Sequence, residues 1–197
     1  MGMAYDTIAS HVVVNGNAIR KIPNHLSFTE AATIPVVFLT AYYSLVELSK
    51  IKAGEKILIH AATGGVGLAA IQIAKYYGAE IFATAGSDKK RNYLKSLGIQ
   101  YVYDSRNINF YEEILNDTNK QGVDIVLNSL TGDAMHKSMQ LLNSFGRFIE
   151  IGKTDMYENS KLGLLVFQNS LSYHMVDLEK MLFEKPEFLG ELLQEII

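Results

Sequence analysis

The sequence predicts an α/β fold, a doubly wound parallel sheet, from three observations. Short apolar runs recur roughly every 20 residues, at Ile57–His60, Glu80–Ala85, Tyr101–Tyr103, Val123–Asn128 and Arg147–Ile151. Most of the segments between these runs have helical spacing and a glycine near their end. The runs are continuous rather than alternating, which is typical of strands buried on both faces. Strands and helices that alternate in this way predict parallel strands joined by right-handed crossovers.

The segments before the first of these runs predict a hairpin and an interrupted helix. Ala9–Val14 and Ala18–Ile22 are strand-like and flank Asn15-Gly16-Asn17, a typical hairpin turn. Ser27-Phe28-Thr29-Glu30 has the pattern of a capping box that opens a helix, and Pro35 interrupts that helix.

The segment after the first apolar run and the end of the chain also have clear helix and strand patterns. Residues 68–77 have helical spacing, and Gly78 stands where a left-handed C-cap belongs. Leu171–Leu178 is a candidate last strand. Glu179 to Ile197 is predicted to be helical, with Pro186 either inside one helix or between two pieces.

Composition narrows the classes of protein to consider. The 197 residues are 48% apolar with only 3 prolines, which suits one medium domain or one domain with an appendage. The net charge of −3 gives no reason to expect nucleic acid or an anionic membrane as partner. The absence of cysteine excludes disulfides, cysteine-ligated zinc and thiol nucleophiles. No apolar run approaches the roughly 20 residues of a membrane span, and we expect a cytoplasmic protein.

The sharpest functional signal is a glycine loop between the run at Ile57 and the helix that follows. Ala62, Gly64 and Gly67 have the G-x-G-x-x-G spacing, with alanine in the first glycine position. Small residues there permit the tight turn, let the backbone approach a pyrophosphate and let the helix pack close to the strand. The free N–H groups of the helix then hold the pyrophosphate. Since the loop follows an apolar strand and opens a helix, we predict a dinucleotide site rather than an ordinary βα turn.

The end of the second strand indicates which nicotinamide cofactor binds. NAD enzymes usually place an acid at this point for the ribose hydroxyls, whereas Ala85-Gly86-Ser87 carries none. Asp88 lies past the strand, where we expect it to cap the next helix. Lys89, Lys90 and Arg91 follow. A charge run is often only a solvated helix face, but a hydroxyl beside cations suits a 2′-phosphate, so the sequence favours NADPH.

Several segments resemble one enzyme family. The glycine loop together with Gly86–Lys90 is similar to the zinc-free branch of the medium-chain dehydrogenase/reductase superfamily, which agrees with the absence of cysteine. Other segments resemble the enoyl reductase domains of modular polyketide synthases and animal-type fatty acid synthases. These segments are Thr40–Tyr43, Asp104–Arg106, Gly122–Leu130 and Gly146–Asp155.

The resemblance implies a Rossmann-like nucleotide domain and a reaction. NADPH would deliver hydride to the β-carbon of an α,β-unsaturated thioester held on an acyl carrier protein, and the enolate would take a proton at the α-carbon. The resemblance places a proton-donating or substrate-positioning pair on Lys153 and Asp177, with Glu179 as the alternative acid in fatty acid synthases. From the residues alone, a strand-end lysine is commonly only solvated, but the place of Lys153 at the carboxyl end of a parallel strand favours a functional role. Asp177 could equally cap the helix that follows.

The resemblance also assigns the cofactor-binding residues. Ser87, Lys90 and Arg106 would hold the 2′-phosphate, and Thr40 and Asn128 would lie near the nicotinamide. The full set is Thr40, Ala62, Gly64, Gly65, Val66, Gly67, Ser87, Lys90, Arg106, Asn128 and Gly152. The histidines show no metal-ligand spacing, so we expect no metal site, and His60 beside an apolar strand is expected to be a hydrogen-bonded core residue.

By the same resemblance, residues 1–26 would be the tail of a β-rich, GroES-like substrate-binding domain and residues 27–165 the NADPH-binding domain. Residues 166–197 would form a last strand and helix that return toward the substrate domain. A substrate domain has roughly a hundred residues or more, so we expect an N-terminally truncated enzyme that is incomplete for turnover.

Three functions remain open from the sequence. The first is an enoyl reductase with neighbouring synthase domains as partners, in which a homodimer and a cyclopropane-forming variant are also open. The second is a stand-alone zinc-free quinone or alkenal reductase. The third is a non-catalytic NADPH-binding module.

Overall fold

A computed structural model describes all 197 residues, and its centre is a six-stranded parallel sheet. The strand order is β3-β2-β1-β4-β5-β6. The strands are β1 (Lys56–Ile59), β2 (Glu80–Ala85), β3 (Tyr101–Asp104), β4 (Val123–Asn128), β5 (Leu142–Glu150) and β6 (Ser172–Met175). The predicted doubly wound sheet is confirmed. The order reverses between β1 and β4, and ligands of such sheets bind in the crevice at that reversal.

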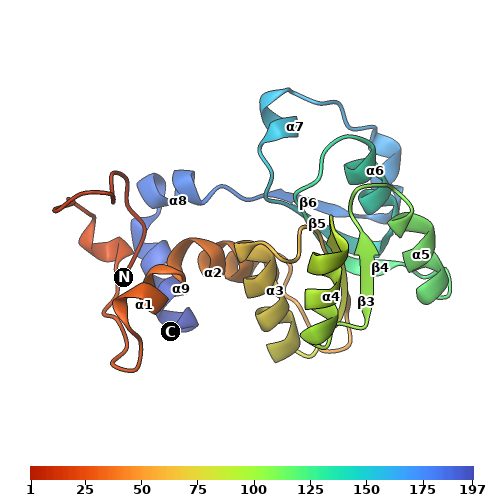
Figure 1. Cartoon of the computed structure of the whole chain (residues 1–197). Helices are drawn as coiled ribbons and strands as arrows, with labels where there is room; N and C mark the ends of the chain where they lie inside the picture. The colour runs from red at the N-terminus through yellow and green to blue at the C-terminus, as the bar shows by residue number, and fades with distance from the viewer.

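Helices cover both faces of the sheet (Figure 1). The helices α3 (Gly65–Tyr76) and α4 (Asp88–Ser96) pack on one face, and α5 (Phe110–Asp117) and α6 (Asp133–Gln140) on the other. Strand β1 shows why, because Ile57 and Ile59 pack in the core beneath α3 and α4, while Leu58 packs in the core beneath α5 and α6. Continuous apolar strands thus supply two cores at once. All the helices are too short or too polar to traverse a lipid bilayer.

Two short helices precede the sheet, as the capping box and Pro35 predict. Ser27 caps α1 (Phe28–Ala32), where its hydroxyl accepts from the Glu30 N–H and the Glu30 carboxylate accepts from the Ser27 N–H. Pro35 is the first residue of α2 (Pro35–Tyr42), a position that needs no N–H donor. Helix α2 continues into the π-helix η2 (Tyr43–Leu48) and packs along α3.

The two C-terminal helices pack against α2, near the start of the chain. Helix α8 (Leu178–Glu184) and helix α9 (Pro186–Ile196) are separate, so Pro186 lies between two pieces. They form a leucine cluster with α2, made of Leu39, Leu178, Leu189, Leu192 and Leu193. Both termini therefore lie on the same side of the sheet (Figure 1). Between β5 and β6 the chain forms α7 (Thr154–Tyr157) and the 3₁₀-helix η3 (Leu164–Asn169).

The predicted N-terminal hairpin is wrong. Residues 9–22 contain no strand, Gly16–Ala18 is the 3₁₀-turn η1, and the only pairing there is an isolated bridge from Ile19 to Gly2. Ile8 and Val13 are fully exposed. A two-stranded hairpin needs an apolar surface to cover, and these side chains meet none within the chain.

Candidate functional site

Apart from Thr40, the expected site residues lie at or just after the carboxyl ends of the strands, along one edge of the sheet. They follow the carboxyl ends of the parallel strands, which lie side by side at that edge. In chain order, these residues are Ala62 to Gly67 after β1, Ser87 and Lys90 after β2, Arg106 after β3, Asn128 ending β4, Gly152 and Lys153 after β5, and Asp177 after β6. Thr40 is buried on α2, where its hydroxyl donates to the Val36 carbonyl at 2.7 Å.

The loop between β1 and α3 presents free backbone donors. The N–H groups of Gly65, Val66 and Gly67, in the first turn of α3, have no hydrogen-bond acceptor within the chain. A Cβ on Gly67 would lie 2.6 Å from the Ala62 Cα, so only glycine lets the helix start this close to the strand. A Cβ on Gly64 would lie 3.2 Å from the Ala61 carbonyl oxygen. Free amides at a helix N-terminus fit a pyrophosphate.

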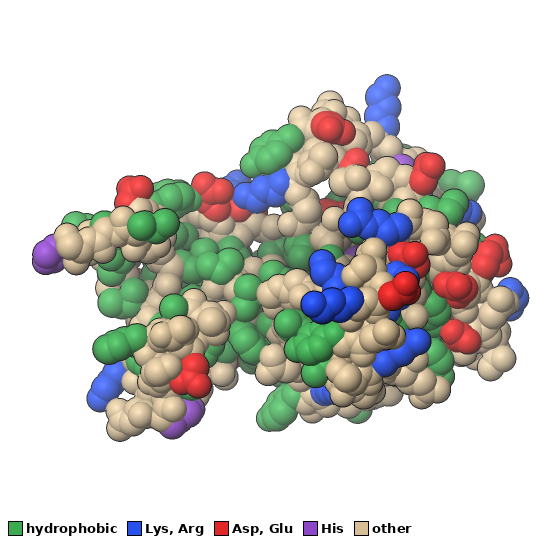
Figure 2. All heavy atoms as spheres, viewed as in Figure 1, with side chains coloured by type: hydrophobic (Ala, Val, Ile, Leu, Met, Phe, Trp, Pro, Cys, Tyr) green, Lys and Arg blue, Asp and Glu red, His purple; other side chains and the backbone are tan.

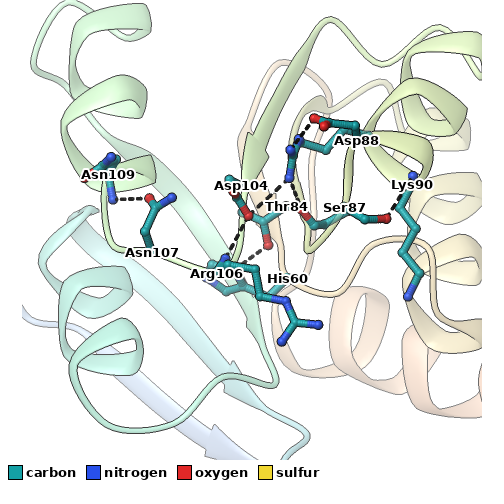
Figure 3. Close-up of polar contacts among 11 residues, drawn as sticks. His60, Thr84, Ser87, Asp88, Lys90, Asp104, Arg106, Asn107 and Asn109 are labelled. Atoms are coloured by element: carbon teal, nitrogen blue, oxygen red, sulfur yellow. Dashed lines mark hydrogen bonds and ion pairs between the residues drawn. The ribbon is translucent and has the colours of Figure 1, made fainter.

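The turn after β2 differs in one respect from the sequence prediction. Ser87, and not Asp88, caps α4: its backbone is extended and its hydroxyl accepts from the Lys90 N–H at 3.4 Å. Asp88 is the first helical residue, so its carboxylate lies beside the helix and pairs with Arg91 at 2.5 Å (Figure 3).

Arg106 reaches this turn from the end of β3. Its side chain crosses Gly86 so closely that a Cβ there would lie 2.6 Å from the Arg106 Nε. The Arg106 N–H donates to the Asp104 carboxylate at 2.9 Å. The side chains of Lys90 and Arg106 have no acidic partner and extend to the same side of the turn (Figure 3). Figure 2 shows basic side chains gathered over α4 and next to it.

A buried acid lies at the other end of the site, and the sequence reasoning missed it. Asn128 donates from Nδ2 to the Glu150 carboxylate at 2.5 Å and to the Leu130 carbonyl at 2.7 Å. Glu150 also accepts from the Gly152 N–H at 2.7 Å, so it joins the ends of β4 and β5. Burial raises the pKa of Glu150 to about 7, against the lowering effect of these donors. The sequence signal that could have identified Glu150 is its position as an acid at the end of an apolar strand run.

Lys153 lies between two carboxylates. Its Nζ is 3.0 Å from Asp177 Oδ1 and 3.3 Å from Glu179 Oε2. Asp177 is also the N-cap of α8, where its carboxylate accepts from the N–H groups of Glu179 and Lys180. The Tyr5 hydroxyl donates to Glu179 at 2.5 Å and completes the cluster. The hydrogen bond to Asp177 raises the pKa of Lys153, which keeps the ammonium charged at neutral pH.

His60 has a structural role, as expected. It is buried, and its ring nitrogens lie 2.9 Å from the Thr84 hydroxyl and 2.7 Å from the Ser138 hydroxyl. Burial lowers the pKa of His60 to about 3, so the ring is neutral. Its contacts connect β1, β2 and α6 rather than reaching the glycine loop.

Comparison with protein families finds a match over most of the sheet. The family described as zinc-binding dehydrogenase matches residues 65–194. The zinc in that description has no counterpart in the residues, because the chain has no group of three or more His, Cys, Asp or Glu that could hold a metal.

Individual relatives are more specific. A phenolphthiocerol/phthiocerol polyketide synthase of Mycobacterium tuberculosis is 47% identical over 191 residues, which are 97% of this chain and 9% of that protein. The nucleotide-binding subdomain of the enoyl reductase domain of PpsC, from the same species, has a TM-score of 0.79 and 50% identity over 82% of this chain and 90% of that one. CurK enoyl reductase has a TM-score of 0.82 and 45% identity, covering 91% of this chain and 53% of that one.

Proposed function

Because the chain belongs to the zinc-binding dehydrogenase family and is homologous to enoyl reductase domains of polyketide synthases, we propose that it is the cofactor-binding part of an NADPH-dependent enoyl reductase. The observation that carries this proposal is the Lys153 ammonium, held by Asp177 and Glu179 at the same sheet edge as the glycine loop. The chain spans 9% of the length of the synthase that it matches, so the neighbouring synthase domains are part of the proposal.

The residues at this edge fit a nicotinamide dinucleotide. The free N–H groups of Gly65, Val66 and Gly67, at the positive end of α3, would hold the pyrophosphate. Lys90 and Arg106, which have no acidic partner, would hold a 2′-phosphate together with the Ser87 hydroxyl and so favour NADPH. The bound nicotinamide supplies the hydride.

The nicotinamide end offers matching polar groups. The Thr40 hydroxyl gives its proton to the Val36 carbonyl, so only its acceptor positions remain for a carboxamide NH₂. The Asn128 side chain is fixed by Glu150 and by the backbone of Leu130, whose N–H donates to the Asn128 Oδ1 at 3.2 Å. A fixed amide keeps the carboxyl end of β4 rigid. Gly152 avoids a clash there, because a Cβ at this position would lie 2.9 Å from the Glu150 Oε1.

Lys153 supplies the electrostatic part of the reaction. Hydride addition to the β-carbon of an α,β-unsaturated acyl thioester places negative charge on the thioester oxygen and the α-carbon. A positioned cation stabilises that charge, and the hydrogen bond to Asp177 keeps Lys153 protonated. We assign Lys153 to hold the enolate oxygen by N–H donation, and Asp177 and Glu179 to fix the position of its Nζ. The substrate is an enoyl chain on an acyl carrier protein.

The test uses the complete enoyl reductase domain of the parent polypeptide with a crotonyl thioester. Lys153→Ala should slow reduction about tenfold or more and leave the Kd for NADPH within about twofold. The matched control is Lys161→Ala, which removes an exposed lysine that has no acidic partner. Unchanged turnover in Lys153→Ala would remove Lys153 from the chemistry, and a quinone reduced far faster than any enoyl thioester would overturn the proposed substrate.

A further inference from the structure

One guanidinium neutralises both acids at the proposed 2′-phosphate end of the site. Arg91 Nη2 lies 2.5 Å from the Asp88 carboxylate, and Arg91 Nη1 lies 3.1 Å from that of Asp104. The same Nη1 donates to the Ala85 carbonyl at 3.0 Å. The Arg91 side chain is only 19% exposed and that of Asp104 35%, so their ion pair forms partly out of water, whereas the Asp88 side chain is 91% exposed and its pair with Arg91 lies at the surface.

The other cations of this region are left free. Lys89, Lys90 and Arg106 are exposed, and none has a carboxylate within ion-pair distance. In Figure 3, Asp88 lies on one side of the turn after β2, whereas the side chains of Lys90 and Arg106 extend toward the other side. The charges are thus sorted: the acids and Arg91 form one group, and the unpaired cations face solvent.

We propose that Arg91 is a specificity-determining positioning residue that holds the Asp88 and Asp104 carboxylates away from the 2′-phosphate of NADPH. This inference rests on the proposed function. An available acid at this end of a dinucleotide fold binds the ribose hydroxyls of NADH. It also repels a phosphate that carries a charge of about −2. Arg91 suppresses both effects, so that Lys90 and Arg106 dominate.

Arg91 acts through its neighbours rather than as a phosphate ligand. Two of its five N–H donors bond the Asp88 carboxylate and the Ala85 carbonyl, and the Asp104 carboxylate lies 3.1 Å from Nη1. The Asp104 oxygen that Arg91 binds is also the acceptor for the Arg106 N–H. Arg91 therefore fixes the backbone from which Arg106 reaches across Gly86, in addition to screening Asp104.

The first measurement is the affinity of the chain for NADPH and NADH, and for adenosine 2′,5′-bisphosphate and AMP, by isothermal titration calorimetry. In Arg91→Met, affinity for the two 2′-phosphorylated ligands should fall about tenfold or more, while affinity for NADH and AMP changes less than about threefold. The matched control is Lys95→Met, which removes one charge from the last turn of α4. It should leave unchanged the ratio of NADPH to NADH affinity and the ratio of bisphosphate to AMP affinity.

The second measurement separates screening from direct binding. Adding Asp88→Asn and Asp104→Asn to Arg91→Met removes the acids that Arg91 neutralised, and the amide oxygen introduced by Asp104→Asn can still accept from the Arg106 N–H. NADPH affinity should then recover to within about threefold of wild type. With Arg91 intact, the same two substitutions should change NADPH affinity by less than about threefold, which provides a test even where Arg91→Met does not fold.

Each outcome separates the inference from the function on which it rests. Equal affinity of the wild type for NADPH and NADH would overturn the proposed cofactor preference. A wild type that prefers NADPH, with an Arg91→Met variant that keeps the same ratio, would overturn only the role of Arg91. Failure of the triple variant to recover would make Arg91 a direct phosphate ligand. A tenfold gain from the acid substitutions alone would show that Arg91 does not screen them.

Discussion

Replacing Glu150 with glutamine is expected to remove a pH dependence from the stability of the fold. Glu150 is only 3% exposed, and burial raises its pKa from 4.5 to about 7. The donors that partly compensate are the Asn128 Nδ2 and the Gly152 N–H. Glutamine has the shape of the protonated acid but does not ionise, so it isolates the cost of the buried charge.

The size and sign of the effect follow from the shift in pKa. A rise from 4.5 to about 7 corresponds to roughly 3 kcal/mol against the ionised form in the folded chain. Below pH 4.5 both states hold the proton, and the protonated acid contributes its full stability. As the pH rises from 4.5 to about 7, the unfolded chain loses the proton first, so the free energy of unfolding falls until both states are ionised.

The assay is urea unfolding of wild type and Glu150→Gln at several values from about pH 5 to about pH 8. Glutamine loses one acceptor, which costs about 1 kcal/mol at every pH. The difference in unfolding free energy should nevertheless move in favour of the variant by most of the roughly 3 kcal/mol as the pH rises. Glu158→Gln, at the exposed end of α7, controls for the loss of one carboxylate. A difference between wild type and Glu150→Gln that stays constant with pH would refute the reasoning.

Three further predictions test other parts of the molecule. Lys90→Met should narrow the gap in affinity between NADPH and NADH about tenfold by removing a cation from the 2′-phosphate, as measured by fluorescence titration. Gly67→Ala places a Cβ 2.6 Å from the Ala62 Cα. It should lower the urea-derived free energy of unfolding by about 1–3 kcal/mol and weaken NADPH binding. Ser138→Ala leaves the buried His60 Nε2 without a partner, which should cost about 1–3 kcal/mol of stability in the same unfolding assay and leave NADPH affinity unchanged.

Local sequence signals predicted the ends of elements well where one residue type determines the backbone conformation. Gly78 has a φ of +71° just after α3, which is the left-handed conformation that ends a helix. The start of β5 was placed too late, at Arg147 instead of Leu142. The reason is tertiary: the pairing of β5 with β4 shifts register between Val123 and Ile125, and such an irregularity lets polar and glycine residues continue a strand.

The prediction of an N-terminal hairpin was wrong for a different reason. Strand propensity in Ala9–Val14 describes a backbone preference, whereas a strand also needs a partner and a surface to cover. The sequence reasoning missed Glu150 and did not foresee the ion pairs of Arg91 for a related reason. Glu150 meets Asn128 across 22 positions of the chain, and Arg91 meets Asp104 from the neighbouring strand end. Their roles arise from pairs that no local pattern encodes, so Arg91 was interpreted as one more free cation.

The pairing of acids along the strand-end edge explains why this edge suits an anionic cofactor. Five acids close to the expected site residues have a dedicated donor: Asp88 and Asp104 have Arg91, Glu150 has Asn128 and Gly152, and Asp177 and Glu179 have Lys153. The first N–H groups of α3 and the side chains of Lys90 and Arg106 have no acidic or acceptor partner within the chain. Carboxylates with dedicated donors, beside donors that have no partner, favour phosphate at both the proposed pyrophosphate and the proposed 2′-phosphate positions. The selectivity of the site is therefore set as much by the residues that neutralise its acids as by those that would touch the ligand.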